Sequence, residues 1–251
     1  MTGVSASRGV ITDNRAVDRF PLILPIALPV IFWAAYHYHK DRHLPEPPQN
    51  LLLCFALGMA AAWLSKGLYL ALDPLGLRFD AFALAEEDTL ALFTYAMLAI
   101  GPIEELSKLL PFLLVVLRFR AFDEPMDGLI YASFIGLGYA LAENLNYLDF
   151  LTPFEAAARG FAGPVVHILF ASIWAFWISR AHIARQPIRR AAILGFLLAA
   201  GLHGIYDFLV MMQPVAALPI AALLIVGIWI WRLRVLRRLH RNAVESEETP
   251  G

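Results

Sequence analysis

Long apolar stretches separated by short polar connections dominate the chain. A helix that crosses the hydrocarbon core of a bilayer needs about 20 mostly apolar residues. The stretches of suitable length are residues 20–38, 51–72, 89–117, 128–149, 160–181, 190–212 and 214–234. This pattern predicts an all-α, polytopic transmembrane helix bundle of about seven spans.

The third stretch, 89–117, leaves the number of spans open. It is long for one crossing, and Gly101-Pro102 lies in its middle. Proline removes a backbone donor and kinks or ends a helix, so this stretch forms either one kinked span or two shorter helices. The expected number of spans is therefore six to eight.

The polar ends of the chain frame one transmembrane domain. Residues 1–19 predict a flexible N-terminal segment, and residues 20–235 predict the helical domain. Residues 236–251 predict a tail that is first basic and then acidic. The apolar stretch after residue 19 ends without a small-residue cleavage site, which indicates a retained anchor rather than a signal peptide.

The composition agrees with a membrane protein. Hydrophobic residues make up 59% of the chain and charged residues 16%, with a mean hydropathy of +0.63. A soluble domain is roughly half apolar and a quarter charged. The single cysteine, Cys54, excludes an intrachain disulfide framework and a cysteine-rich metal cluster. The formal net charge of -1 gives no indication of a nucleic-acid partner, and none is expected.

The distribution of basic residues predicts the orientation. Lys40, Arg118, Arg185 and the arginine-rich segment 232–241 fall on one side of the predicted spans. Fewer lysines and arginines fall on the other side, although residues 1–19 hold three arginines. Because basic residues favour the cytoplasmic side, the C-terminus is predicted to be cytoplasmic.

Ionisable side chains lie inside these apolar stretches, where each costs a few kcal/mol and usually serves a function. Glu104 and Glu105 lie in the third stretch, with Lys108 one helical turn after Glu104. Neighbouring helical residues point about 100° apart. We therefore expect one glutamate to do chemistry while the other orients it or pairs with Lys108.

The next three stretches add further polar groups. Tyr139 lies one turn before Glu143, which Asn144 follows. His167 occupies the fifth stretch, and the sixth places His203 one turn before an aspartate, Asp207. Four carboxylates thus oppose one lysine, and burying them together requires protonation, water or a cation.

These groups suit two versions of hydrolysis. Imidazoles and carboxylates from different helices are the ligand types of a zinc site with an open position for water, and zinc would activate that water. Alternatively, one glutamate acts as general base without a metal, and a histidine with Asn144 or Asp207 stabilises the oxyanion. The residues alone leave both versions open.

Other features predict structure rather than chemistry. Small residues at 136, 138, 140 and 142 would let a neighbouring helix approach closely. Asp127 lies at a helix start, where capping explains it. Trp174, Trp177, Trp229 and Trp231 lie toward segment ends and predict an interfacial aromatic belt.

The order of the polar motifs resembles the PrsW family of intramembrane proteases, within the wider group of CPBP proteins and prenyl-protein proteases. The matching motifs are Glu104-Glu105-x-x-Lys108, Asp127-Gly128 through Tyr139-x-x-x-Glu143-Asn144, His167, and His203-x-x-x-Asp207. They cover about residues 98–210. Tyr139 stands where the family pattern has phenylalanine, and we hypothesise that its hydroxyl adds a hydrogen bond next to Glu143.

With this resemblance, the expected function is that of an intramembrane metal-dependent endopeptidase that uses glutamate-activated water, with zinc as the expected metal. The expected catalytic residues are Glu104, Glu105, Glu143 and His203. The expected metal ligands are Glu143, His167 and His203. The expected supporting residues are Lys108, Tyr139, Asn144 and Asp207, the last of which would orient His203. The resemblance also implies the inner membrane of a prokaryote, and a membrane-anchored substrate of the anti-sigma-factor type.

Two other classes of function use the same residues. A proton-coupled transporter could use Glu104, Glu143 and His203 as a relay, but it predicts inverted repeats, and the sequence has no convincing repeat. A membrane scaffold could keep the polar residues only to bind partner helices. It predicts that Glu105→Gln leaves every biochemical phenotype intact.

Overall fold

The computed structural model describes residues 20–40, 45–212 and 217–248, and the predicted flexible segment 1–19 lies outside them. All regular elements in these ranges are helical. The long helices are α1 (Phe20–Lys40), α2 (Pro48–Leu72), α6 (Pro125–Asn146), α7 (Pro153–Ile183), α8 (Ile188–Met211) and α9 (Ala217–Glu248). The shorter elements are η1 (Asp73–Leu75), α3 (Ala81–Glu87), α4 (Thr89–Tyr95), η2 (Ala96–Ile100), α5 (Gly101–Leu114), η3 (Val116–Arg118) and η4 (Leu148–Phe150).

The predicted all-α transmembrane bundle is confirmed. Five helices in the described ranges are long and apolar enough to cross a membrane: α1, α2, α7, α8 and α9. Helix α6 and the continuous segment α4–η2–α5 occupy the two remaining apolar stretches that predicted spans. Helix α9 continues to Glu248, well past the predicted domain boundary at residue 235.

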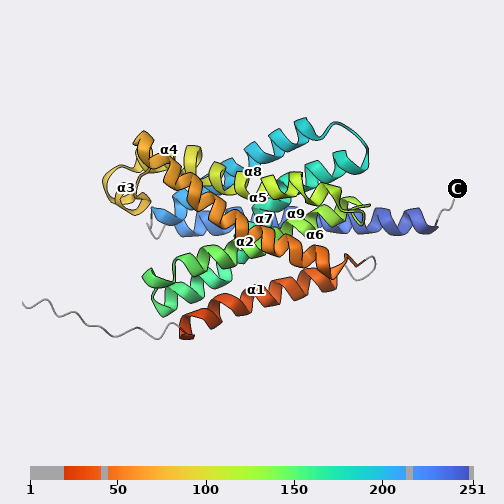
Figure 1. The fold of residues 1–251 in the computed structure, drawn as a ribbon, viewed down its shortest axis with the longest axis horizontal. Helices are drawn as coiled ribbons and strands as arrows, with labels where there is room; N and C mark the ends of the chain where they lie inside the picture. Colours follow the sequence, from red (N-terminus) through yellow and green to blue (C-terminus); the bar gives the residue numbers. More distant parts are fainter. Residues whose placement is uncertain (1–19, 41–44, 213–216, 249–251) are drawn as a thin grey trace, which may run out of the picture.

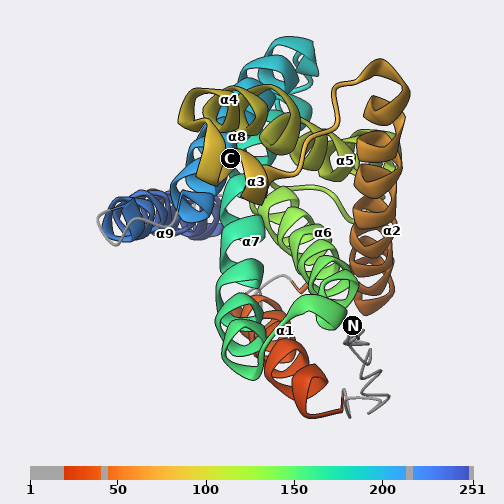
Figure 2. The same ribbon diagram turned by 90° about the vertical axis from the view of Figure 1, so that its left-hand side faces the viewer.

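Helices α6 and α7 form the centre of the bundle. Figure 2 shows them side by side, with α2 beside α6, α1 below them, α8 above and α9 at the outer side of α7. Both helices begin with capping boxes, Glu124 with Asp127 and Thr152 with Glu155. Each box satisfies backbone N–H groups that the first turn leaves free. The expected capping role of Asp127 is confirmed, because its Oδ2 accepts from the Asp123 and Glu124 N–H groups.

Small residues on α6 allow the close approach that the sequence predicts. A Cβ at Gly138 would lie 1.9 Å from the Phe55 carbonyl oxygen of α2, and one at Gly136 would lie 2.9 Å from the backbone of His167 on α7. Gly58 makes the reciprocal contact, with its Cβ position 2.0 Å from the Ile135 carbonyl oxygen. Helix α6 is therefore clasped from two sides at backbone distance, which brings the polar residues of three helices within reach of one another.

The third predicted span is continuous but distorted (Figure 1). A π-helical turn, η2, precedes Gly101-Pro102, and the Gly101 N–H donates to the Ala96 carbonyl five residues back. Proline at 102 cannot donate to residue 98, so a local adjustment of the hydrogen-bond register at this point is expected. The sequence located the distortion correctly, and the helix continues through a π-helical turn there rather than splitting in two.

A glycine contact joins this distorted turn to α8. A Cβ at Gly101 would lie 2.3 Å from the Ala200 carbonyl oxygen, and one at Gly204 would lie 2.6 Å from the Ala96 carbonyl oxygen. Neither backbone has room for a methyl group. Because Gly101 precedes the two glutamates of α5 and Gly204 follows His203, this crossing sets the distance between those side chains.

Arg232 departs from its expected position among the basic residues outside the spans. Its side chain is buried, and it donates from Nε to Ser172 Oγ at 2.7 Å and from Nη2 to Ser133 Oγ at 2.8 Å. It therefore ties α9 to α6 and α7 inside the bundle. The orientation prediction has to rest on the remaining basic residues, such as Arg237 and Arg238, which are exposed.

We expect Gly101→Ala to lower the free energy of unfolding by about 1–3 kcal/mol, because the added methyl overlaps rigid backbone atoms of α8. Gly67→Ala is the matched control, since nothing lies within 4 Å of its Cβ position. The control should be neutral or more stable by about 0.5–1 kcal/mol, because alanine is the better helix former. Thermal unfolding in detergent measures both, and equal stability of the two variants would contradict the tight crossing.

Candidate active site

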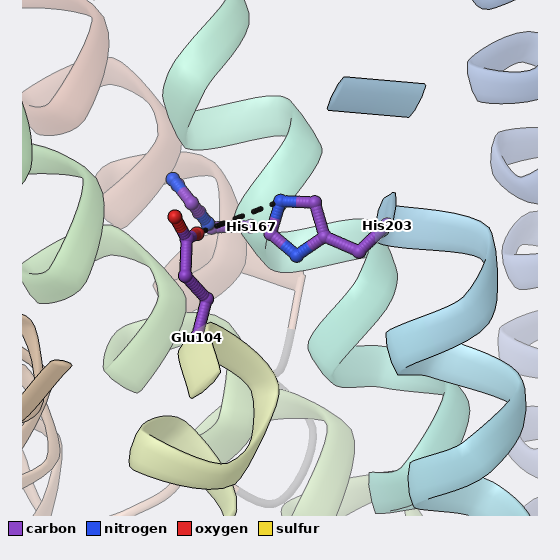
Figure 3. A group of neighbouring side chains, drawn as sticks. All are labelled: Glu104, His167 and His203. Atoms are coloured by element: carbon purple, nitrogen blue, oxygen red, sulfur yellow. Dashed lines mark ion pairs between the residues drawn. The ribbon is translucent and has the colours of Figure 1, made fainter. Parts of the chain in front are cut away.

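Four helices bring the predicted polar residues together. They are Glu104, Glu105 and Lys108 from α5, Glu143 from α6, His167 from α7, and His203 and Asp207 from α8. Figure 3 shows Glu104 pointing toward the imidazole rings of His167 and His203. The convergence that the motifs predict is thus present in the fold.

Glu105 is the most completely bonded residue of the site. Its carboxylate is fully buried, and its Oε1 accepts from Lys108 Nζ at 2.5 Å and contacts His203 Nδ1 at 2.8 Å. Its Oε2 accepts from Trp174 Nε1 at 2.9 Å. Because both oxygens are occupied, Glu105 holds other groups in place and has no free oxygen for water.

Lys108 connects Glu105 to His167. Its ammonium lies 3.1 Å from His167 Nδ1 and 4.7 Å from the centre of the Tyr139 ring. A protonated lysine only donates hydrogen bonds, so Nδ1 is the acceptor and Nε2 carries the proton. The Nε2–H group then donates to Glu143 Oε2 at 2.8 Å. Both nitrogens of His167 are therefore engaged.

His203 has the opposite arrangement. Its Nδ1 faces the Glu105 carboxylate and donates to it, which leaves the Nε2 lone pair free. Nε2 lies 3.6 Å from Glu104 Oε2 and 3.6 Å from Asp207 Oδ2, beyond hydrogen-bonding distance of both. Asp207 Oδ2 is buried and has no hydrogen-bond partner among the described residues. An unpaired nitrogen and two carboxylates thus face one small space.

Glu104 is the most weakly bonded of the three glutamates of the site. Its Oε1 accepts only a long hydrogen bond, 3.4 Å, from the Tyr69 hydroxyl, and its side chain retains 11% exposure. The side chains of Asp207 and Glu143 retain 16% and 21%. The site is therefore completely closed around Glu105 and Lys108, and it keeps partial exposure at Glu104, Asp207 and Glu143.

Glu143 is held by a residue that the sequence did not single out. Arg159, seven residues into α7, donates from Nη2 to Glu143 Oε1 at 3.0 Å and from Nε to Asn144 Oδ1 at 3.2 Å. The Asn144 side chain in turn donates to the Arg159 carbonyl at 3.3 Å. With Arg159 included, four carboxylates oppose two cations. Two negative charges remain in excess if all carboxylates are ionised and both imidazoles neutral.

Trp174 corrects the expectation of an interfacial tryptophan. It is completely buried and donates to Glu105, whereas Trp177 on the same helix is 46% exposed and fits the predicted belt. Nothing in the sequence distinguishes the two tryptophans, which are three positions apart on α7, because the packing decides which of them faces the protein interior.

For Arg159 the sequence did hold a signal. The four carboxylates outnumbered the one lysine of the motifs, so a further cation was needed near them.

Tyr139 contributes its ring rather than a hydrogen bond to Glu143. Its hydroxyl shares a hydrogen bond of 2.6 Å with Ser65 Oγ of α2, and its ring packs against His167 with centroids 4.8 Å apart. The hydroxyl therefore anchors α6 to α2. This contact explains why a tyrosine at this position is compatible with the rest of the site.

A group of three residues fits a divalent cation. Glu104, His167 and His203 each offer one ligand atom, and these atoms lie within 4.8 Å of one another. The set of metal ligands predicted from the sequence contains Glu143 in place of Glu104. In the structure, Glu143 accepts a hydrogen bond from His167 Nε2. The free Nε2 of His203 and the unpaired Asp207 oxygen fit a cation well. His167 would first have to give up one of its two hydrogen bonds.

Comparisons with known proteins identify relatives over most of the chain. Residues 46–232 match the family described as PrsW family intramembrane metalloprotease. Protease PrsW of Oceanobacillus iheyensis is 29% identical over 218 residues, which cover 86% of this chain and 94% of the relative. Protease PrsW of Geobacillus kaustophilus is 30% identical over 193 residues, 76% of this chain and 80% of the relative. No solved structure matches the chain.

We expect Trp174→Phe to lower the free energy of unfolding by about 1.5–3 kcal/mol, because it leaves a buried oxygen of Glu105 without its donor. Trp177→Phe is the control on the same helix and should stay within about 0.5 kcal/mol of the wild type. Thermal unfolding in detergent provides the comparison. An equal loss in both variants would mean that ring volume, rather than the indole N–H, determines the effect.

We also expect a measurable coupling between Ser65 and Tyr139. Ser65→Ala and Tyr139→Phe each remove the same hydrogen bond, so the double variant should be less destabilised than the sum of the single variants by about 1 kcal/mol. Additive losses in the unfolding measurements would show that the two hydroxyl groups do not depend on each other.

Proposed function

Because this chain belongs to the PrsW family of intramembrane metalloproteases, we propose that it hydrolyses peptide bonds of membrane-anchored proteins with water activated by Glu104. It is a protease and a prokaryotic multi-pass membrane protein, as the relatives named Protease PrsW indicate. The observation that carries the proposal is the different bonding of the two adjacent glutamates. The Glu104 side chain is partly exposed and weakly hydrogen-bonded, whereas that of Glu105 is fully buried and has hydrogen bonds at both oxygens.

Glu104 has the properties of a general base. A base must reach the proton that it removes, directly or through one water, and its oxygens must not be committed elsewhere. The Glu104 side chain keeps 11% exposure, and the one hydrogen bond that it makes within the described residues, from Tyr69, is long. Glu105 then takes the second role that we expected of this pair, because it bonds both Lys108 and His203.

A protonated His203 would stabilise the developing charge of the reaction, because both of its ring nitrogens then donate hydrogen bonds. Its Nδ1 is held by Glu105, so its Nε2 is directed at the space beside Glu104 and Asp207. An imidazole fixed by a carboxylate has a defined orientation and tautomer. Asp207 faces the same nitrogen and remains the proposed partner that orients His203 from the open side.

The metal-dependent form of the proposal uses zinc. His167 and His203 would hold it together with Glu143, which contacts His167, so that Glu104 stays free to act as the base; Glu104 is the alternative carboxylate ligand. When bound, zinc would lower the pKa of a coordinated water and polarise the substrate carbonyl. Glu105 would then accept a hydrogen bond from Nδ1 of His203, as carboxylates usually do from the second ring nitrogen of a metal-bound histidine.

One contact favours a second candidate, the metal-free glutamate-dependent protease. Lys108 lies 3.1 Å from His167 Nδ1, which places the imidazole proton on Nε2 and makes that nitrogen a donor to Glu143. A metal ligand needs a lone pair, not a proton, at the coordinating nitrogen. In this form Glu104 still acts as base, and His203 provides the stabilising donor when it is protonated on both ring nitrogens.

The substrate and orientation complete the proposal. A peptide in an intact helix hides its carbonyl groups in hydrogen bonds, so we expect substrates with an unwound segment that enters between helices. An anti-sigma factor anchored in the inner membrane is the proposed substrate type. The C-terminal side is proposed to be cytoplasmic, with the basic residues of α9 beyond Arg232 facing that compartment.

We expect Glu104→Gln to reduce cleavage by at least about 100-fold, because the amide cannot take a proton from water. The assay counts new amino termini that the detergent-purified protein forms from a proteome-derived peptide library. Glu86→Gln, the same substitution at an exposed position on α3, is the control and should cleave like the wild type. Thermal unfolding should confirm that both variants are folded.

Mass spectrometry of bound metal in the same samples separates the two forms. Stoichiometric zinc in the wild type that is lost in His203→Ala and His167→Ala supports the metal-dependent form. A wild type that cleaves without metal supports the glutamate-dependent form. A wild type no faster than Glu104→Gln contradicts both.

A further inference from the structure

We propose that Arg159 is a positioning residue of this site, which fixes the Glu143 carboxylate so that one of its oxygens stays on His167. The inference rests on the proposed protease function, and it adds a residue that belongs to none of the matching motifs. It concerns the rim of the site, where the Arg159 side chain is 36% exposed and that of Glu143 is 21% exposed.

The guanidinium contacts two residues of the last turn of α6 and the residue that follows the helix. Nη2 donates to Glu143, Nε donates to Asn144, and the group lies 4.4 Å from the centre of the Tyr147 ring. Two donors of one rigid, planar fork therefore bind two adjacent side chains, while the flat face of the group rests on an aromatic ring. A lysine could supply the charge but not this combination of directions.

The backbone that carries Arg159 is also held. A Cβ at Gly160 would lie 2.2 Å from the Pro25 carbonyl oxygen of α1, so α7 and α1 touch at the next residue. The Asn144 side chain donates to the Arg159 carbonyl, and a Cβ at Gly163 would lie 3.2 Å from its amide nitrogen. These contacts fix the position of the Arg159 backbone, in addition to the contacts that fix its guanidinium group.

The consequence for Glu143 is a division of its two oxygens. Oε1 is taken by Arg159 and Oε2 by His167. Without the arginine, the carboxylate could rotate, and Glu104, Glu143 and Asp207 would have no lysine or arginine bonded to them among the residues that the structure describes, since the buried Lys108 bonds Glu105 and His167. Arg159 therefore acts on the reaction through Glu143 and His167, and it needs no contact with the substrate.

The first test is a kinetic comparison on the peptide library. Arg159→Gln should reduce kcat by about 10- to 100-fold with KM changed less than about twofold, because displaced groups slow the reaction without removing binding contacts. Arg159→Lys should fall between it and the wild type. Arg180→Gln is the matched control, an exposed arginine of α7 that also lies over an aromatic ring but has no carboxylate partner in the described part of the chain.

The second test does not depend on cleavage. In thermal unfolding, Arg159→Gln should lower Tm by about 2–4 °C in the wild-type background and by much less in the Glu143→Gln background. A wild-type kcat in Arg159→Gln, or an equal Tm loss in both backgrounds, would overturn the inference. A wild type no faster than Glu104→Gln would instead overturn the protease site itself, with the Arg159–Glu143 coupling still visible in Tm.

Discussion

The ion pair between Lys108 and Glu105 governs the geometry of this site. Both side chains are fully buried, so each charge requires the other, and loss of one partner in such a pair typically costs 3–5 kcal/mol. The remaining bonding capacity of the pair goes to the two histidines. Lys108 reaches His167, and Glu105 reaches His203 and Trp174. One partner of the ion pair, Lys108, thus orients His167, and the other partner, Glu105, orients His203.

Backbone packing makes this contact possible. Gly101 and Gly204 let α5 and α8 cross in close contact, because backbone atoms of the neighbouring segment occupy the space that a side chain would need. Gly136 has the same effect between α6 and α7. A polar cluster this dense needs helices that approach closely, since long side chains reaching across a wider gap would lose orientation. The π-helical turn before Gly101 relieves the missing proline hydrogen bond at the same place.

The site consists of a rigid half and an open half. Glu105, Lys108 and Trp174 are shielded from solvent and hydrogen-bonded, whereas Glu104, Glu143 and Asp207 remain partly exposed. Hydrolysis needs both properties, because fixed groups lower the reorganisation required in the transition state and an open side admits water and peptide. The excess of negative charge on the open side is also what would attract a divalent cation, whereas the contact of Lys108 with His167 opposes it.

The sequence by itself determined the all-α membrane fold, the position of the distortion near Gly101-Pro102 and the set of polar residues that converge. The length of an apolar stretch and the presence of an ionisable residue inside it can be read directly from the sequence. It could not assign Glu105 to Lys108, turn Trp174 inward, place Arg232 among serines or give Arg159 its carboxylate. These outcomes depend on which faces of separate helices meet. Contacts between residues far apart in the chain follow from packing, and only the tertiary structure decides them.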